Sequence, residues 1–548
     1  LWPVANDKRL QPFRVTMASK YTGIALLISM LIILAILAPT SEHEPASRHV
    51  PDIPLPPNPL CPPGSDCAEV HTCSSDSFTS PLGTETSWEN SGPNRMMSSP
   101  HTADLTGDGI LDIIVGTGVE QPPEGSIIAL DGSTGELLWE RNASQEMFAS
   151  AQFAHLNDDT ILDVILGGRQ HELLAVSGVD GSLIWQFDAL NDARENWYQF
   201  YTGQFIEDQD GDGYEDWLTS NGGDPTAAPG APRDNGYLTI ISGATGEVIA
   251  VADTPDNRET YMSPLLYQPH PEMELEVIFG TGGETWDGGL WTTSISSIMS
   301  GDISNATRIV SPVPGVSKGI MAPPSIADLN LDGISDIVAG TFDGRLIAID
   351  GRNYSTLWSL DAKEYAVGQP TDAESWASPS IGYFTDDAIP DVVAHFVIGK
   401  FPEYHSSITL LVDGESGELL FSEDTHHTSF TTPLAADLNG DGRDEVVMIR
   451  GAGALFSDNE GYIFYNQATI LDTCQMSQYE LYNRSGMSIG TPMIVDLDQD
   501  GYLEMITTTT TGYSSDVDQW TVTRINLNAT TPDHLSWGAY LGTNFDGV

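Results

Sequence analysis

The chain has 548 residues, of which 78 are acidic and 21 are Lys or Arg, so its formal net charge is −57. A surface this acidic repels phosphate backbones and anionic lipid headgroups, which excludes nucleic acid as a favoured partner. Apolar residues still make up 40% of the chain and occur in short runs. This composition excludes a disordered chain and suits salty surroundings, calcium, or both.

The first predicted element is an apolar helix near the N-terminus. Residues 21–41 carry no charge, a lysine precedes them and two glutamates follow, which is the pattern of a membrane span with its positive flank inside. We therefore expect residues 1–16 to be an upstream or cytoplasmic segment, with Met17 as a candidate start, and residues 17–41 to be a transmembrane anchor. A cleaved signal peptide is the alternative, although Pro39 disfavours cleavage just before it. In both cases the remainder is expected at the cell surface or outside the cell.

Residues 42–85 are expected to form a stiff linker. Proline recurs through "PDIPLPPNPLCPP", a composition that favours extended polyproline conformation and holds a domain away from the membrane. The linker also contains three of the four cysteines. Two disulfides are expected in preference to a zinc site, and their pairing stays open. The cysteines are Cys61, Cys67, Cys73 and Cys474.

From residue 86 onward, one unit repeats eight times. Its marker is an acidic loop of the form D-x-[DN]-x-D-G-x-x-[DE] before an apolar run, and successive loops start 51 to 60 residues apart. A period of this length indicates a solenoid, a propeller or an array. Full or near-full copies start at Asp104, Asp208, Asp328, Asp437 and Asp496, and degenerate copies start at His155, Gln268 and Tyr383.

Each unit also carries a strand-like run and a hairpin, as in "IIALDGSTGELLWE" at residues 127–140, so it supplies about four short strands. The expected fold class is all-β, an eight-bladed β-propeller over residues 86–548, with a seven-bladed ring as the alternative. Residues 86–105 align without a gap with residues 137–156, so the domain opens on an outer strand that could complete the last blade. The segment "HLSWGAYLG" at 534–542 also resembles an outer strand, which leaves the closure of the ring open.

The acidic loops are predicted to be calcium sites that join two strands. An EF-hand is excluded, because its twelfth position must be acidic and is Thr219 in the loop that starts at Asp208. Positions 1, 3, 5 and 9 offer side-chain oxygens, and an ordinary Asp/Asn/Gly turn explains one such loop better than five. We expect about five structural calcium sites, and hydrogen bonds alone in the degenerate loops. The predicted ligands are Asp104, Thr106, Asp108, Asp112, Asp208, Asp210, Asp212, Asp216, Asp328, Asn330, Asp332, Asp336, Asp437, Asn439, Asp441, Glu445, Asp496, Asp498, Asp500 and Glu504.

Two families show similar motifs. The acidic loop before an apolar strand resembles the FG-GAP (VCBS-type) repeat of integrin α-subunit propellers and microbial surface proteins. The segment "DGSTGELLW" at 131–139 resembles the repeat of quinoprotein (PQQ)-like eight-bladed propellers. The two resemblances interleave over about residues 86–548, and they imply calcium at the base of the blades and ligand binding by the opposite face. Fold similarity alone does not establish function.

A bulky apolar residue lies seven positions before every loop start. These side chains are expected near the central axis, either as packing between blades or as the floor of a ligand-binding pocket. They are Met97, Phe148, Tyr201, Tyr261, Met321, Trp376, Phe430 and Ile489. Polar residues two positions earlier could line the entrance of such a pocket: Arg95, Glu146, Gln199, Glu259 and Glu374.

The expected function is binding or adhesion to an extracellular glycan or protein ligand, with the membrane as a second partner through the N-terminal helix. A secreted enzyme, either a quinoprotein dehydrogenase or a polysaccharide lyase, is the alternative. PQQ is not expected as a cofactor, because the chain lacks the adjacent cysteines found in many quinoprotein dehydrogenases. Five N-x-[ST] sequons predict glycan sites, at Asn142, Asn305, Asn353, Asn483 and Asn528.

Overall fold

The computed structural model describes Cys73 and residues 82–548, apart from 121, 190–195, 225–226, 228–230, 232, 284, 369, 401–402, 456–461 and 512–517. The predicted anchor, the segment before it, most of the linker, Cys61 and Cys67 lie outside the described residues. Within the described part of the chain, no helix is both long enough and apolar enough to cross a membrane.

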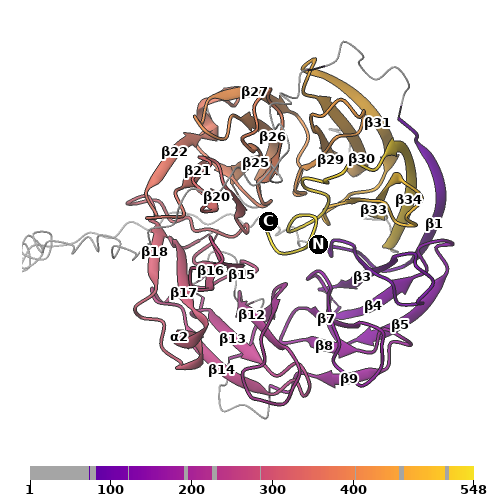
Figure 1. Ribbon diagram of the computed structural model, residues 1–548, viewed down its shortest axis with the longest axis vertical. Coiled ribbons are helices and arrows are strands. Elements are labelled where there is room, and N and C mark those ends of the chain that lie inside the picture. The colour runs from indigo at the N-terminus through magenta and orange to yellow at the C-terminus, as the bar shows by residue number, and fades with distance from the viewer. Residues whose placement is uncertain are drawn as a thin grey trace, which may run out of the picture. The chain divides into compact units, whose positions relative to one another are not determined.

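The described residues form an eight-bladed β-propeller, with antiparallel sheets arranged around a central axis (Figure 1). Blade 1 contains β2 (His101–Ala103), β3 (Asp112–Val119), β4 (Glu124–Leu130) and β5 (Leu137–Ala143). Blade 2 contains β6 (Gln152–Ala154), β7 (Asp163–Gly167), β8 (Leu173–Val176) and β9 (Leu183–Gln186). Blade 3 contains β10 (Gln199–Phe200), β11 (Gln204–Ile206), β12 (Asp216–Gly222), β13 (Tyr237–Ile241) and β14 (Val248–Asp253). Blade 4 contains β15 (Leu265–Tyr267), β16 (Glu276–Gly280), β17 (Leu290–Ser294) and β18 (Thr307–Val310).

The second half of the ring has the same plan, with longer strands in blades 6 to 8. Blade 5 contains β19 (Ser325–Ala327), β20 (Asp336–Gly340), β21 (Arg345–Ile349) and β22 (Thr356–Asp361). Blade 6 contains β23 (Ala373–Glu374), β24 (Ser380–Gly382), β25 (Asp391–Lys400), β26 (Glu403–Val412) and β27 (Leu419–Thr425). Blade 7 contains β28 (Leu434–Ala436), β29 (Glu445–Leu455), β30 (Tyr462–Asp472) and β31 (Ser477–Ser485). Blade 8 contains β32 (Met493–Val495), β33 (Tyr502–Thr511), β34 (Gln519–Thr530) and β1 (Glu85–Pro93). The described helices are the short α2 (Ile295–Met299) and the single-turn η1 (Ala362–Glu364).

Strand β1 closes the ring. It pairs antiparallel with β34, from Glu85 opposite Asn526 to Pro93 opposite Gln519, so the start of the propeller supplies the outer strand of its last blade. Of the closures that the sequence left open, this is the one that the alignment of residues 86–105 indicated. A disulfide between Cys73 and Cys474 adds a covalent link between the segment before β1 and the turn that follows β30 in blade 7.

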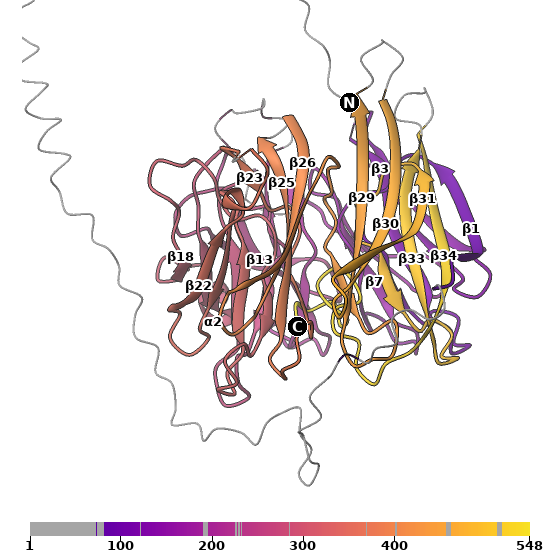
Figure 2. The ribbon, with the colours of Figure 1, turned by 90° about the horizontal axis from the view of Figure 1, so that it is seen from above.

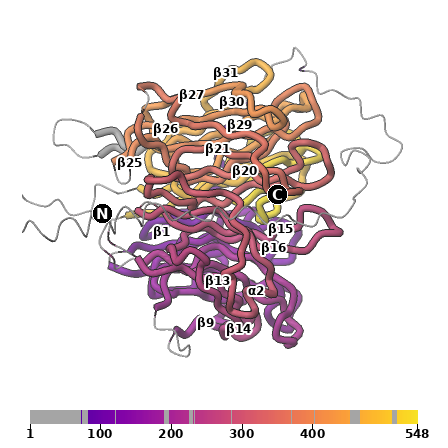
Figure 3. The backbone as a smooth tube through the Cα atoms, turned by 90° about the vertical axis from the view of Figure 1, so that its left-hand side faces the viewer, coloured from indigo at the N-terminus to yellow at the C-terminus, as the bar shows by residue number. Residues whose placement is uncertain are grey.

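Residues 531–548 form an axial plug rather than an outer strand. The backbone of Trp537 pairs with that of Ala435, at N–O distances of 2.9 and 3.0 Å, and Ile326 N–H donates to the carbonyl of Gly547 at 2.9 Å. Trp537 and Leu541 are fully buried. Figure 1 shows the C-terminal end at the centre of the ring, and Figures 2 and 3 show the same segment from the side. The resemblance of "HLSWGAYLG" to an outer strand was therefore wrong, because its tryptophan packs near the axis.

The burial of each strand follows its place in the blade. All eight residues of β3 are buried, since neighbouring blades cover both faces of the sheet. The outer strands expose alternate residues, and the one buried residue of β1, β5, β9 and β22 is a tryptophan in each case. Each of these indoles donates to a glycine carbonyl in the next blade's hairpin, as Trp139 does to Gly178 at 2.8 Å. The "DGSTGELLW" motif thus joins neighbouring blades.

Candidate functional site

All eight acidic loops lie at one end of the propeller, because each joins the innermost strand of a blade to its second strand. We call this end the loop face. The opposite end carries the connections from one blade to the next and the turns between second and third strands, and we call it the far face. The predicted calcium ligands and the predicted apolar ring therefore lie on opposite ends of the molecule.

The first loop residue organises the backbone of the turn. The carboxylate of Asp208 accepts the N–H groups of Gly211 at 2.6 Å and Gly213 at 2.8 Å, and Gly213 takes a positive φ of 94° that favours glycine. These two hydrogen bonds hold the pKa of Asp208 below its usual value. The four other full loops repeat the contact between position 1 and the position-6 glycine, at Asp104, Asp328, Asp437 and Asp496.

The ninth loop residue has a role that the sequence did not reveal. The buried carboxylate of Asp216 accepts Gln209 N–H at 2.6 Å on one oxygen and Gly243 N–H at 3.2 Å on the other, so it ties the loop to the hairpin of its own blade. The same carboxylate clamp is made by Asp163 and Asp391 in two of the degenerate loops. These two loops thus keep the clamp although their first residue is not acidic. Burial raises the pKa of Asp391 to about 7.

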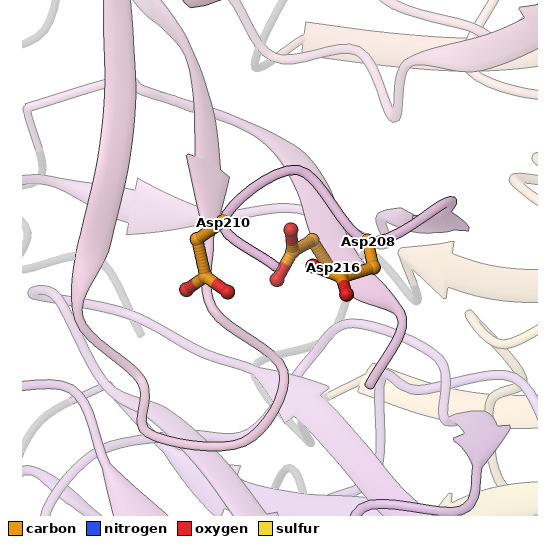
Figure 4. Close-up of side chains that lie close together, drawn as sticks. All are labelled: Asp208, Asp210 and Asp216. Atoms are coloured by element: carbon orange, nitrogen blue, oxygen red, sulfur yellow. The ribbon is translucent and has the colours of Figure 1, made fainter. Parts of the chain in front are cut away.

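Two of the five predicted calcium loops bring three carboxylates together. Asp208, Asp210 and Asp216 offer oxygens that all lie within 4.8 Å of one another (Figure 4), and Asp496, Asp498 and Asp500 do the same. Calcium binds oxygen at about 2.3–2.6 Å, so ligands on opposite sides of the ion lie about 4.6–5.2 Å apart. Both groups therefore fit the ion. The other three full loops do not gather three acidic oxygens in this way among the described residues, and their third residue is Thr106, Asn330 or Asn439.

Arginine already neutralises part of two of the five full loops. In blade 8, Arg524 pairs with Asp498 at 2.5 Å and with Glu504 at 3.1 Å. In blade 5, Arg352 pairs with Asp332 at 3.0 Å. Among the ion pairs of the described residues, none involves the blade 3 loop at residues 208–216. The blade 3 loop consequently keeps the largest uncompensated negative charge, and it is the best candidate for a cation.

The far face carries the predicted apolar ring. All eight of its side chains are half-buried, and each lies three or four residues before an innermost blade strand. Neighbours in the ring touch: Phe148 and Tyr201 have ring centroids 5.4 Å apart, and those of Trp376 and Phe430 are 6.0 Å apart. Tyr261 continues the series, 6.3 Å from Tyr201. The structure therefore brings these predicted residues together around the axis and leaves each of them partly exposed.

Two charged side chains and a tyrosine lie beside the apolar ring. Arg169 lies 5.1 Å above Phe148, pairs with Glu146 at 2.5 Å and donates to Gln199 at 2.6 Å. On the other side of the axis, Lys318 and Tyr404 both contact the buried carboxylate of Glu374. Arg169, Lys318 and Tyr404 were missed from the sequence, because they come from connections and hairpins with no fixed offset from the acidic loops.

Comparisons with known proteins support the fold. The sequence model of the family described as FAM234A/B beta-propeller matches residues 86–272. No curated protein matches. Solved structures with the same fold include the quinohemoprotein alcohol dehydrogenase ADHIIG from Pseudomonas putida HK5, at 13% identity and a TM-score of 0.53, covering 82% of this chain and 77% of that one.

Two further structures extend this comparison. Quinohemoprotein alcohol dehydrogenase from Comamonas testosteroni matches at 10% identity and a TM-score of 0.51, covering 82% of this chain and 78% of that one. A europium-containing methanol dehydrogenase matches at 11% identity and a TM-score of 0.50, covering 80% of this chain and 93% of that one. At such low identities the likeness concerns the fold. The family match covers β1, blades 1 to 3 and the start of blade 4. In this part of the ring, Trp88, Trp139 and Trp185 each donate to a glycine carbonyl of the next blade.

Proposed function

We propose that this protein is an exported, membrane-anchored β-propeller that is stabilised by calcium and binds an extracellular glycan or protein ligand with its far face. One observation carries the proposal. Eight bulky side chains stand around the axis on the face opposite the acidic loops, and all of them keep exposed surface. Side chains that only packed between blades would be expected to be buried, as Met96 and Met147 are at 2% and 0% exposure. Partly exposed aromatic side chains around an axis suit a binding surface.

The disulfide and the sequons support export. Disulfides such as Cys73–Cys474 persist in oxidising compartments. All five sequon asparagines are exposed. Four of them lie on outer strands or in the turns that lead into outer strands, and Asn528 lies on β34. Glycans at these positions would surround the rim and leave the apolar ring uncovered.

The calcium part of the proposal rests on the blade 3 and blade 8 loops. Calcium bound there by Asp208, Asp210 and Asp216, and by Asp496, Asp498 and Asp500, would neutralise converging carboxylates and fix the loop face. Its role is structural, since the loops lie at the opposite end from the apolar ring.

The test compares the full chain displayed on cells with the variants Tyr201→Ala and Trp376→Ala, using arrays of glycans and extracellular proteins with calcium present. Saturable binding that both variants weaken at unchanged folding supports a far-face binding site. Retention of full affinity by both variants would exclude the apolar ring. The enzymatic alternative, a quinoprotein dehydrogenase or a polysaccharide lyase, predicts instead dye reduction with added quinone, or unsaturated products from a polysaccharide.

A further inference from the structure

A cavity of about 170 Å³ opens on the far face above blade 5. Its walls come from three segments: the connection from β18 to β19, the turn between β20 and β21, and the connection from β22 to β23. We call it the blade 5 pocket. Its volume corresponds to about six water molecules of liquid, which is below the size of a drug-like site and suits a single small ring.

Charged side chains dominate the blade 5 pocket, and their charges cancel. Lys318, Arg345 and Lys363 contribute +3, and Asp343, Asp361 and Asp372 contribute −3, so the lining sums to 3 − 3 = 0. The chain has only five lysines, and two of the three that follow residue 85 are in this pocket. On a chain with a net charge of −57, such a concentration of cations in one cavity calls for a ligand that uses them.

The charged groups are already fixed by one another. Arg345 holds Asp343 with two parallel hydrogen bonds, from Nε at 2.7 Å and from Nη2 at 2.8 Å. Lys363 pairs with Asp361 at 3.3 Å and also donates to the backbone carbonyl of Asp343. Among the described contacts, Arg345 therefore keeps both N–H groups of Nη1, and Lys363 keeps one of its three. Asp372 adds further acceptor oxygens to the lining.

This arrangement selects against ionic ligands. An anion could reach only Nη1 of Arg345 and one N–H of Lys363, whose charges Asp343 and Asp361 already neutralise, and it would approach against the field of the whole chain. A cation would lie among three positive side chains, and Asp372 is the one lining carboxylate outside the ion pairs of the described residues. A polyhydroxyl ring needs donors and acceptors at fixed positions and no net charge, and Val313 and Val316 provide an apolar wall for its C–H face.

We infer that the blade 5 pocket binds one uncharged sugar residue of a glycan, held by Arg345, Lys363 and Asp372. The inference rests on the proposed function, because it names the ligand class that the far face would bind. The pocket also adjoins the apolar ring, since Phe342 contacts Trp376 with ring centroids 4.9 Å apart. A glycan seated in the pocket could therefore continue along the apolar ring.

The experiment titrates the full chain with neutral methyl glycosides of the common hexoses at millimolar concentration, by saturation-transfer NMR. Glucuronate and glucosamine serve as acidic and basic counterparts. Saturable binding of a neutral glycoside is expected, with both charged sugars weaker. Lys363→Met and Asp372→Asn should each weaken that binding about tenfold, the effect of one lost polar contact. Lys400→Met removes an exposed lysine outside the pocket and should change nothing.

The inference is overturned by tighter binding of glucuronate, by saturable binding of no neutral glycoside, or by equal losses in the Lys400→Met control. Melting temperatures of all three variants check that they fold. The array test described for the proposed function distinguishes a failure of the pocket inference from a failure of far-face binding. If Tyr201→Ala abolishes ligand binding and the pocket variants do not, the far face binds but the pocket does not hold a sugar. If none of these variants affects binding, the proposed function fails as well.

Discussion

His101 stacks on Phe545 with ring centroids 3.8 Å apart and ring planes only 12° apart. His101 begins the innermost strand of blade 1, and Phe545 belongs to the axial plug, so this contact joins the two ends of the described propeller. The carbonyl of Phe545 also accepts hydrogen bonds from Gln152 at 3.1 Å and Gln204 at 3.2 Å, on the inner strands of blades 2 and 3. The plug thus holds together the first three blades, which lie far from it in the sequence.

The pH dependence of stability should report this contact. Burial lowers the pKa of His101 from 6.5 to about 4. Between these values the unfolded chain binds one more proton at this position than the folded chain, so the contribution of His101 to stability is complete above pH 6.5 and falls as the pH drops toward 4. This contribution has a slope of about 1.4 kcal/mol of unfolding free energy per pH unit. His101→Phe keeps an aromatic ring and should lower the slope by this amount, whereas the slope from the buried His395, whose pKa burial lowers to about 3, remains.

Urea unfolding at several pH values between 4 and 6.5 measures the effect. His101→Phe also leaves the carbonyl of Ala151 without its imidazole donor, at 2.6 Å in the structure, and should lower stability by about 1 kcal/mol at neutral pH. His534→Asn, an exposed histidine in the same C-terminal segment, is the control and should leave the slope intact. Parallel slopes for wild type and His101→Phe would show that His101 does not titrate with folding.

Calcium removal should act mainly through the blade 3 loop. Chelation is expected to lower the melting temperature, because calcium at one hundred times its dissociation constant stabilises the folded state by about 2.7 kcal/mol. Asp210→Asn should reduce the difference between calcium and chelator, since Asp210 is one of three converging carboxylates with no arginine among them. Asp498→Asn should reduce that difference less than Asp210→Asn does, because Asp498 already pairs with Arg524.

Differential scanning calorimetry with calcium and with chelator measures both variants. An unchanged melting temperature after chelation contradicts structural calcium altogether. A smaller remaining calcium effect in Asp498→Asn than in Asp210→Asn, by contrast, would move the main site to blade 8.

The repeat pattern predicted the ring far better than it predicted the parts between repeats. The count of eight, the closing role of β1 and the apolar ring all follow from fixed offsets relative to the acidic loop, which every blade shares. The axial plug has no fixed offset from an acidic loop. The local pattern around Trp537 is that of an outer strand, and its actual place depends on packing against the innermost strands. The pair Lys318–Glu374 likewise joins the connection from β18 to β19 to strand β23 of blade 6.

Each tryptophan contact between blades requires a glycine beneath the indole. At Gly181, φ is +69° and an added Cβ would lie 2.7 Å from Trp139 Cε3. Gly181→Ala should therefore destabilise by about 2–4 kcal/mol, from strained backbone plus a steric clash. Gly368 has a similar φ of +83° and nothing within 4 Å of an added Cβ, so Gly368→Ala is the matched control. It should lower stability by only about 1–2 kcal/mol.

Chemical denaturation of the two alanine variants isolates the clash, because the backbone contribution is common to both. Equal losses of stability would mean that Trp139 moves away without penalty, and that the contact between blades 1 and 2 does not depend on the fit of the indole against the glycine.

The Cys73–Cys474 disulfide should stabilise the closed ring. It links residues that are 401 positions apart, and cross-linking a long loop lowers the entropy of the unfolded chain. Cys474→Ser is expected to lower the unfolding free energy by about 2–5 kcal/mol. Because β1 forms the outer edge of blade 8 just after Cys73, the variant should also be cut more readily before residue 85 by added protease.

Guanidinium unfolding with and without dithiothreitol gives the matched comparison. Reducing the wild-type protein should shift its midpoint to that of Cys474→Ser, whereas the variant's midpoint should stay where it is. If the wild-type bond is shown to be reduced and the midpoint does not move, the ring is closed by β1 pairing and the axial plug alone. The disulfide would then mark the compartment of the protein without contributing to its stability.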